Sequence, residues 1–353
     1  GVKEGKFGLA LIRASGAVAG VFTSNRARAA PVEVMVDRVH RGKLDAIIVN
    51  SGCANAYTGN RGINDAEEMC AIAAESLGLE PGSIGVASTG VIGRYLNLPL
   101  IRDQCDRIAP LLARNGDAED VAARAIMTTD TFPKHALIET GSFSVGGIAK
   151  GSGMIAPNMG TMLAFIYTDA EIETPHLHDI LRQATRRSFN RVVVDGDTST
   201  NDVAICTATG AAGKVDRKEL ERAIETVCRN LAIQIARDGE GATKLLEVTV
   251  RGANDEDEAA TVARTIVASP LVKTAVYGED PNWGRVIAAA GRSGAEFDPY
   301  AVSLRVGGVP LVVDGEIVAD LRAAKIAMHG SSVTFDLDLA AGDGNATAWG
   351  CDL

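Results

Sequence analysis

The segment APNMGTMLAF, residues 156–165, places a hydroxyl where a chain cleavage would make it reactive. Thr161 follows Gly160 and precedes the apolar run 162–167, so the pattern predicts a buried strand directly after it. If the chain is cut before Thr161, the freed α-amine, with a pKa of about 7.7–8.0, lies beside the hydroxyl and can accept its proton. Gly160 leaves the attacked carbonyl open and tolerates strained backbone angles. These residue types favour an N-terminal threonine nucleophile; the alternative is a threonine that merely begins a strand.

Other chemistries fit the sequence less well. His176 and His178 are two residues apart on a predicted helix and point to different faces, and DGDTSTND (195–202) lacks the ligand order of a calcium loop, so we expect no metal site. GGIAKGSG (146–153) has the wrong residue order around Lys150 for a Walker loop. The G-x-S-x-G motif of serine hydrolases is absent. We therefore expect an enzyme without metal or cofactor.

The composition indicates a globular protein with a core sufficient for one large or two ordinary domains. The chain has 353 residues, of which 46% are hydrophobic and 23% charged. Its net charge of -10 argues against nucleic acids and anionic membranes as partners. No apolar run approaches the ~20 residues of a membrane helix, and no signal peptide is visible. The 6 cysteines form no C-x-x-C pair, which favours free thiols and a cytoplasmic location.

Strand-like and helix-like segments alternate, which predicts a layered α/β architecture. Strands are predicted at 44–52, 83–88, 142–155 (with a glycine-rich turn), 161–167, 191–197, 202–210 and 244–252. One helix is predicted from a cap at Asn64 to about Leu77, with Glu67 completing a capping box. Further helices are predicted at 98–113, 117–128, 174–188 and 216–237, and one begins at about Asp255. We place the boundary to a second domain near residue 240.

The segment AKGSGMIAPNMGTMLAFIYTDA, residues 149–170, resembles the self-cleavage region of the ornithine acetyltransferase family, the glutamate N-acetyltransferases of arginine biosynthesis. Further matches follow the family's order over nearly the whole chain: VASTGVIG, IMTTDTFPK, DGDTSTND, ARDGEGATK, SPLVKTAVYGEDPNWGR and the terminal GCDL. The resemblance implies an αββα sandwich of the ornithine acetyltransferase/aminopeptidase type over residues 1–240. It implies a smaller C-terminal α/β domain over residues 241–353.

The resemblance also implies roles for single residues. Thr161 is the implied nucleophile, freed by cleavage of the Gly160–Thr161 bond, and Thr89 and Gly90 are the implied oxyanion hole. The residues themselves agree, because a strand that ends in Ser-Thr-Gly presents a hydroxyl and a backbone N–H, the two donors that such a site needs. Without the family, a simple strand-to-loop turn explains the same residues.

Thr128, Lys150, Thr161 and Glu240 are the implied substrate contacts. Lys150 would pair with the α-carboxylate of the amino-acid substrate, and Glu240 would bind a cationic amino group. Glu240 lies just past a predicted helix C-terminus, an electrostatically poor place for an anion, which itself hints at a function. Relatives continue past the GCDL segment into a tail that also contacts substrate, whereas this chain ends at Leu353.

The implied reaction is a ping-pong transfer of acetyl from N2-acetyl-L-ornithine to L-glutamate through acetyl-threonine. Some members of the family also accept acetyl-CoA as donor. The resemblance further implies that fragments 1–160 and 161–353 stay associated and that two such pairs form a heterotetramer. Two alternatives remain: an aminopeptidase or amidohydrolase of similar fold, with water in place of glutamate, and a non-enzymatic metabolite-binding or structural protein.

Overall fold

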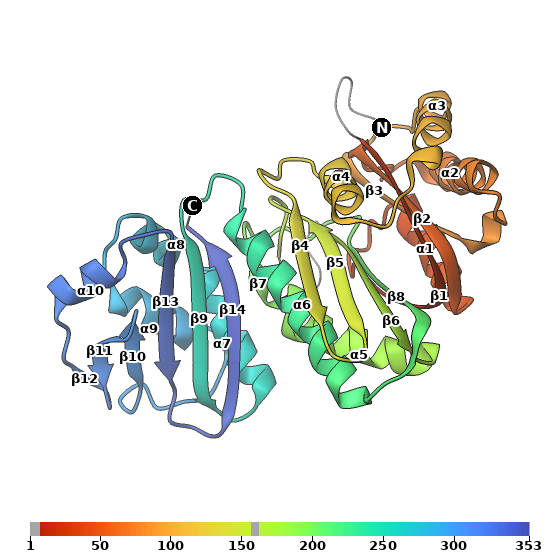
Figure 1. Cartoon of the computed structure of the whole chain (residues 1–353). Helices are drawn as coiled ribbons and strands as arrows, with labels where there is room; N and C mark the ends of the chain where they lie inside the picture. Colours follow the sequence, from red (N-terminus) through yellow and green to blue (C-terminus); the bar gives the residue numbers. More distant parts are fainter. Residues whose placement is uncertain (1–7, 157–161, 353) are drawn as a thin grey trace. The chain divides into compact units, whose positions relative to one another are not determined.

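The computed structural model describes residues 8–156 and 162–352. The chain forms two compact units, of which the first comprises Gly1–Phe189 and Asp197–Leu231 and the second Asn190–Gly196 and Ala232–Leu353. The segment Asn190–Gly196 of the second unit therefore comes before Asp197–Leu231 of the first unit in the chain. Figure 1 shows the elements of both units coloured along the sequence.

In the first unit, strands and helices alternate along most of the chain, as the sequence predicts. The strands are β1 (Leu9–Phe22), β2 (Lys43–Cys53), β3 (Ile84–Val91), β4 (Lys134–Glu139), β5 (Ser144–Lys150), β6 (Leu163–Glu171) and β8 (Val203–Lys214). The helices are α1 (Ala30–His40), α2 (Gly59–Leu77), α3 (Leu98–Ile108), α4 (Gly116–Ile126), α5 (Thr174–Arg187) and α6 (Arg217–Arg237), whose last residues belong to the second unit.

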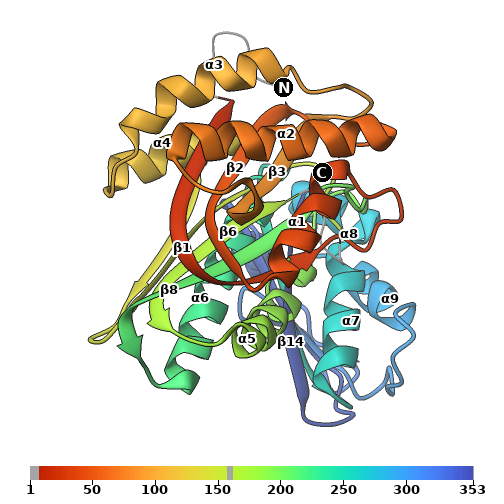
Figure 2. The same ribbon diagram turned by 90° about the vertical axis from the view of Figure 1, so that its right-hand side faces the viewer.

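One sheet joins these strands in the order β3-β2-β1-β8-β6-β5-β4. The long strand β1 connects its two halves: the first part of β1 pairs with β2 and the second part with β8. The register shifts between Arg13 and Gly16, and β1 is visibly curved in Figure 2. A Cβ on Gly16 would lie 2.0 Å from the carbonyl oxygen of Ala208, so only glycine allows β1 to approach β8 this closely at the bend.

The bend turns the sheet back on itself into two layers. Ile47 of β2 belongs to the same buried cluster as Phe165 of β6 and Ile205 of β8. The next residue of β2, Ile48, instead packs in a cluster with Met69 of α2, as expected for a strand whose side chains alternate between two covered faces. Helix α5 packs against β1 and β8. The αββα layering that the family resemblance predicts is therefore confirmed.

The second unit is built around a sheet with the order β12-β11-β10-β13-β9-β14-β7. Its strands are β7 (Val192–Val193), β9 (Leu245–Ala253), β10 (Ser303–Val306), β11 (Val309–Val313), β12 (Glu316–Ile317), β13 (Ser332–Asp338) and β14 (Gly344–Cys351). Its helices are α7 (Glu256–Val267), α8 (Pro270–Tyr277), α9 (Trp283–Gly291) and α10 (Leu321–Ala327). Helix α7 packs on β9 and β14 over an apolar core, which makes this unit an α/β domain of its own.

Two predicted details differ from the structure. Helix α2 begins at Gly59, so Asn64 lies inside the helix and does not cap it, and Glu67 forms an ion pair with Arg38. Gly59 and Gly62 are weak helix formers, but the Asn55 amide donates a 2.8 Å hydrogen bond to the Gly62 carbonyl and holds this turn in place.

The helix predicted over 98–113 is also too long. Helix α3 ends at Ile108 and is followed by a short 3₁₀ helix over Ala109–Leu111, where Pro110 cannot donate a backbone hydrogen bond. The patterns predicted no element before residue 44, where β1 and α1 lie, and β4 was not predicted either. Gly160 and Thr161, predicted at the start of a strand, lie outside the described residues.

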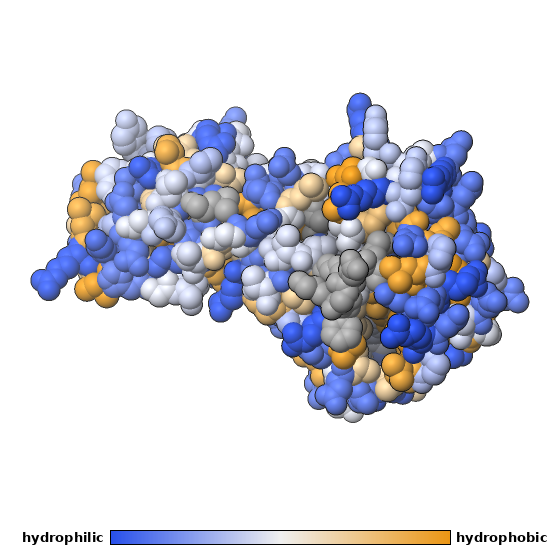
Figure 3. Space-filling view, turned by 90° about the horizontal axis from the view of Figure 1, so that it is seen from above, coloured by the Kyte–Doolittle hydropathy of each residue, from blue (hydrophilic) through white to orange (hydrophobic). Residues whose placement is uncertain are grey.

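The face in Figure 3 carries apolar residues in small separate groups on a mostly polar surface. Among the described residues, none of the helices has both the length and the apolar character that crossing a membrane requires.

Candidate active site

The two predicted oxyanion residues lie at the end of β3, where it runs parallel to β2. Gly90 pairs in register with Gly52, and its φ of 132° is a conformation that favours glycine. A Cβ on Gly90 would lie 2.3 Å from the carbonyl carbon of Gly52. The preceding residue, Thr89, is 1% exposed, whereas Gly90 is exposed. The strand end therefore offers a buried hydroxyl beside an open backbone that no larger residue could form.

Lys150 brings a positive charge to this strand end. It is the last residue of β5, is 1% exposed, and its Nζ donates a 3.1 Å hydrogen bond to Oγ1 of Thr89. Because the Thr89 oxygen accepts this bond, its own hydrogen points away from Lys150 and can be donated to another group. The structure thus brings together Thr89, Gly90 and Lys150, although Lys150 is far from the other two in the sequence.

Asp130 is a buried acid that the sequence reasoning did not single out. Its Oδ1 accepts hydrogen bonds from Lys134 Nζ and from the Gly151 N–H, both at 2.7 Å, and its Oδ2 accepts from the Thr128 N–H at 2.9 Å. Burial alone would raise the pKa of Asp130, but the ammonium groups of Lys150 and Lys134 and these hydrogen bonds lower it to about 2. Asp130 is therefore an anion that connects Thr128 to the residue after Lys150.

The described start of β6 lies directly beside Lys150. Leu163 pairs with Lys150 on one side and with Val203 of β8 on the other. The N–H of Met162 donates a 2.9 Å hydrogen bond to Oδ1 of Asp202, a second buried acid that the sequence reasoning did not single out. Burial raises the pKa of Asp202, and the hydrogen bond from Met162 and the charge of Lys150 oppose this rise only in part.

The loop that carries Asp202 also supports the end of β3. The side-chain amide of Asn201 donates hydrogen bonds of 2.7 Å to the Ala54 carbonyl and 2.8 Å to the Ser88 carbonyl. Ser88 immediately precedes Thr89, so one amide ties the 197–202 loop to the strand end that carries the predicted oxyanion hole. The segment DGDTSTND contains both Asn201 and Asp202, and its density of polar residues next to a strand was the available signal.

Glu240 belongs to the second unit, where it is exposed in the turn after α6. Asp352 holds this turn: its Oδ1 accepts from the N–H groups of Thr243 at 2.8 Å and Lys244 at 2.6 Å, and its Oδ2 accepts from the Thr243 hydroxyl. Asp352 is the third residue of the terminal GCDL segment. Within the second unit, Asp352 of that segment therefore holds the residues that directly follow the turn containing Glu240.

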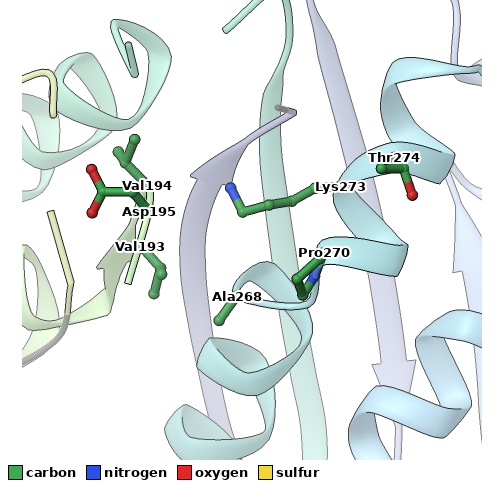
Figure 4. Close-up of a pocket in the computed structure, with 7 residues that line it drawn as sticks. All are labelled: Val193, Val194, Asp195, Ala268, Pro270, Lys273 and Thr274. Atoms are coloured by element: carbon green, nitrogen blue, oxygen red, sulfur yellow. The ribbon is translucent and has the colours of Figure 1, made fainter. Parts of the chain in front are cut away.

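A pocket of about 130 Å³ in the second unit lies between the β7 segment and the start of α8 (Figure 4). Lys273 extends into it, is 4% exposed, and donates a 2.6 Å hydrogen bond to the Cys351 carbonyl. Burial lowers the pKa of Lys273, and the neighbouring Cys351, Asp195 and Asp352 oppose this. The bond to Cys351 anchors the strand end just before Asp352, which assigns Lys273 a structural task.

No donor set for a metal ion is visible in the part of the chain that the structure describes: within 8–156 and 162–352, no group of three or more His, Cys, Asp or Glu side chains is arranged to hold one. All six cysteines are buried free thiols, as the sequence predicts.

Comparisons with known proteins agree with the motifs. The model of the ArgJ family matches residues 1–353. A glutamate N-acetyltransferase of Methanosarcina mazei is 48% identical over 365 residues, covering 100% of this chain and 92% of the relative. An arginine biosynthesis bifunctional protein ArgJ of Archaeoglobus fulgidus is 46% identical over 357 residues, covering 100% and 93%.

Among solved structures, the crystal structure of an arginine biosynthesis bifunctional protein ArgJ from Bacillus halodurans is 42% identical, with a TM-score of 0.51 over 52% of this chain and 91% of that chain. Sequence, motifs and fold point to the same conclusion. The chain belongs to the ArgJ family of acetyltransferases.

Proposed function

We propose that this enzyme cleaves itself between Gly160 and Thr161 and uses the freed Thr161 to transfer acetyl from N2-acetyl-L-ornithine to L-glutamate. Thr161 takes the acetyl group and releases L-ornithine, and the acetyl-threonine then gives it to glutamate. The names of the relatives, glutamate N-acetyltransferase and arginine biosynthesis bifunctional protein, support this pair of reactions. The observation that carries the proposal is the Lys150–Thr89 hydrogen bond beside the described start of β6.

Thr89 and Gly90 would stabilise the oxyanion of the tetrahedral intermediate. The hydroxyl of Thr89 and the N–H of Gly90 are the two donors, and Lys150 strengthens the first of them because a hydroxyl oxygen that accepts from a cation becomes a better donor. Donors held in place before the reaction need no reorganisation during it, which is the main advantage of an oxyanion hole. The 1% exposure of Thr89 supports this role, because exclusion of water strengthens such bonds.

Thr128, Lys150, Thr161 and Glu240 would contact the substrates. Lys150 carries the charge that complements an α-carboxylate, and Glu240 the charge that complements an amino group of ornithine. The hydrogen bonds of Asp130 to the N–H groups of Thr128 and Gly151 support a fixed geometry around the first two contacts. Acetyl-CoA as a second donor stays part of the proposal, since relatives are named bifunctional.

After cleavage, fragments 1–160 and 161–353 would remain associated. Strand β6 pairs with β5 on one edge and β8 on the other, and Leu163 and Phe165 are buried at 1% and 0% exposure. Separating β6 from β5 would expose this apolar surface at a cost of roughly 25 cal/mol per Å² and would break a row of backbone hydrogen bonds. We propose that two such pairs assemble into a heterotetramer in the cytoplasm.

The test combines mass analysis with a transfer assay. The purified chain is expected to give two fragments, the second beginning with Thr161, and to form N-acetylglutamate only when both acetylornithine and glutamate are present. Thr161→Ala should leave one intact, inactive chain. Thr168→Ala, on the same strand and with a buried side chain, is the matched control and should be cleaved normally. Acetyl release without glutamate at the same rate would instead identify a hydrolase, and an active intact Thr161→Ala chain would refute the proposal.

A further inference from the structure

The carboxylate of Asp130 and the ammonium of Lys134 form an ion pair that is closed off from water. Both side chains are 0% exposed, and Lys134 Nζ lies 2.7 Å from Asp130 Oδ1. The ammonium also donates a 3.3 Å hydrogen bond to the Phe132 carbonyl and lies 4.8 Å from the centre of the Phe132 ring. Removing two charges from water costs about as much free energy as their attraction returns, so stability alone does not explain this pair.

Asp130 connects two segments that carry predicted substrate contacts. Its Oδ2 accepts the N–H of Thr128 at 2.9 Å, and its Oδ1 accepts the N–H of Gly151 at 2.7 Å. Gly151 directly follows Lys150, the last residue of β5. One carboxylate therefore sets the spacing between the backbones at Thr128 and Lys150. An asparagine could not do the same, because its amide nitrogen would face one of the two N–H donors.

Two cations act on this single anion, and they have different hydrogen-bond partners. Burial alone would raise the pKa of Asp130, but the charges of Lys150 and Lys134 lower it to about 2. Lys134 donates directly to Asp130, whereas Lys150 donates to Oγ1 of Thr89 at 3.1 Å. If Lys134 did not offset the Asp130 charge, this charge would attract the Lys150 ammonium more strongly. Lys134 thus serves Asp130, and Lys150 stays directed at Thr89.

We propose that Asp130 and Lys134 are positioning residues for the recognition of the substrate α-carboxylate. This inference rests on the proposed function, in which Lys150 and Thr128 contact the substrate. Asp130 holds the backbones that carry these two contacts. Lys134 offsets the charge of Asp130, so that the Lys150 ammonium keeps its direction. Asp130 and Lys134 act through the two contact residues and do not touch the reacting atoms.

The position of Lys150 can be measured through the choice of acetyl donor. N2-acetyl-L-ornithinamide has a neutral carboxamide in place of the α-carboxylate, so it cannot form the charged contact with Lys150. The ratio of kcat/KM for acetylornithine to kcat/KM for this amide therefore reports how well Lys150 meets a carboxylate. This donor ratio does not depend on the amount of active enzyme, because both donors react with the same molecules. A loss of folded or cleaved chain alone leaves the donor ratio unchanged.

Both single variants should lower the donor ratio about tenfold or more. In Lys134→Met the Asp130 charge remains and should draw the Lys150 ammonium away from Thr89. In Asp130→Asn the spacing between the two contact segments is lost. The double variant Asp130→Asn/Lys134→Met removes both charges, so it should melt at a higher temperature than Asp130→Asn. Its donor ratio should nevertheless stay low, because the carboxylate that joins the two segments is still missing. A purely structural pair would instead recover both stability and donor ratio in the double variant.

Arg38→Met is the matched control, because Arg38 is 4% exposed, lies in the first unit and forms an ion pair with Glu67. Arg38→Met should be less stable than the wild type but should keep the wild-type donor ratio. A donor ratio within threefold of the wild type in folded Lys134→Met, or in the folded double variant, would overturn the inference. These two variants decide if Asp130→Asn alone does not fold.

The wild type itself separates this inference from the proposed function. A wild-type enzyme that forms N-acetylglutamate but does not prefer acetylornithine to the amide would overturn the inference and leave the acetyl transfer standing. A wild-type enzyme that forms no N-acetylglutamate from either donor would instead refute the proposed function.

Discussion

The ammonium nitrogen of Lys150 lies 3.1 Å from the hydroxyl oxygen of Thr89, and both side chains are only 1% exposed. The two residues come from the ends of β5 and β3, strands that the bend in β1 brings together across the sheet. A buried cation that donates to a hydroxyl fixes the direction of that hydroxyl's own hydrogen. The pair therefore behaves as one unit: in the proposed mechanism Thr89 contacts the reacting group, and Lys150 orients Thr89.

This coupling predicts a non-additive double mutant. Thr89→Val and Lys150→Met should each lower kcat about 10²- to 10³-fold, the usual cost of an oxyanion-hole donor. The double variant should be about as slow as the slower single variant, because each change alone already removes the oriented hydroxyl. The measurement is kcat at saturating acetylornithine, normalised to cleaved chain. A double variant slowed by the product of the two factors would show that the residues act independently.

Gly90 gives a prediction about stability. Gly90→Ala would place a methyl group 2.3 Å from the Gly52 carbonyl carbon, on a residue whose φ is 132°. We therefore expect the free energy of unfolding to fall by ~3 kcal/mol or more, or the chain to fail to fold. Gly93→Ala is the matched control, because Gly93 has a φ of 79° but nothing within 4 Å of the added atom. Gly93→Ala should lower the free energy of unfolding by only ~1 kcal/mol. Thermal melting of both variants measures the difference, and equal losses would mean that the contact with Gly52 is not limiting.

Sequence patterns predicted elements better than they predicted the relations between them. The apolar run of β2 and the long apolar face of α6 are local properties, so they were visible along the chain. The start of α2 was wrong because the Asn55–Gly62 hydrogen bond, and not helix propensity, decides it. The bend in β1 was not predicted, since it depends on how closely Gly16 approaches Ala208.

The same distinction applies to the site. Thr89, Gly90 and Lys150 were predicted as site residues because they lie in motifs that resemble a family, and not because any spacing indicated that they meet. Asp130 and Asp202 lie in segments that carry that resemblance, yet neither was recognised. Their contacts come from partners that only the fold supplies: two ammonium groups for Asp130 and the Met162 N–H for Asp202.

Asp352 predicts an effect of the terminal segment on substrate binding. Asp352→Ala removes the acceptor of two backbone N–H groups and one hydroxyl in the turn after Glu240, so we expect ~2–4 kcal/mol of destabilisation. If Glu240 binds the amino group of the donor, KM for acetylornithine should rise about tenfold or more while kcat changes less. Asp352→Asn keeps one acceptor, so its stability and its KM for acetylornithine should lie between those of the wild type and Asp352→Ala. An unchanged KM in a folded Asp352→Ala enzyme would separate this turn from substrate binding.

Asp130 predicts a specific loss of stability in acid. Its folded-state pKa of about 2 lies below the ordinary 3.8, so the native state favours its charged form. The charged Asp130 therefore contributes ~2 kcal/mol to the free energy of unfolding. This contribution is fully present above the pKa of Asp130 in the unfolded chain, near 4, and is lost as the pH falls from about 4 through about 2.

Urea unfolding isolates this contribution when Thr161→Ala is compared with Thr161→Ala/Asp130→Asn at several pH values from 7 to 2. The Thr161→Ala background is used because a chain that cannot cleave itself can refold as one piece. The Asp130→Asn chain should be less stable at neutral pH, since Lys134 then lies buried without its anionic partner. The difference between the two chains should shrink by ~2 kcal/mol below pH 4, where the reference chain loses the Asp130 charge. A difference that stays constant down to pH 2 would mean that Lys134 and Lys150 do not hold Asp130 as an anion.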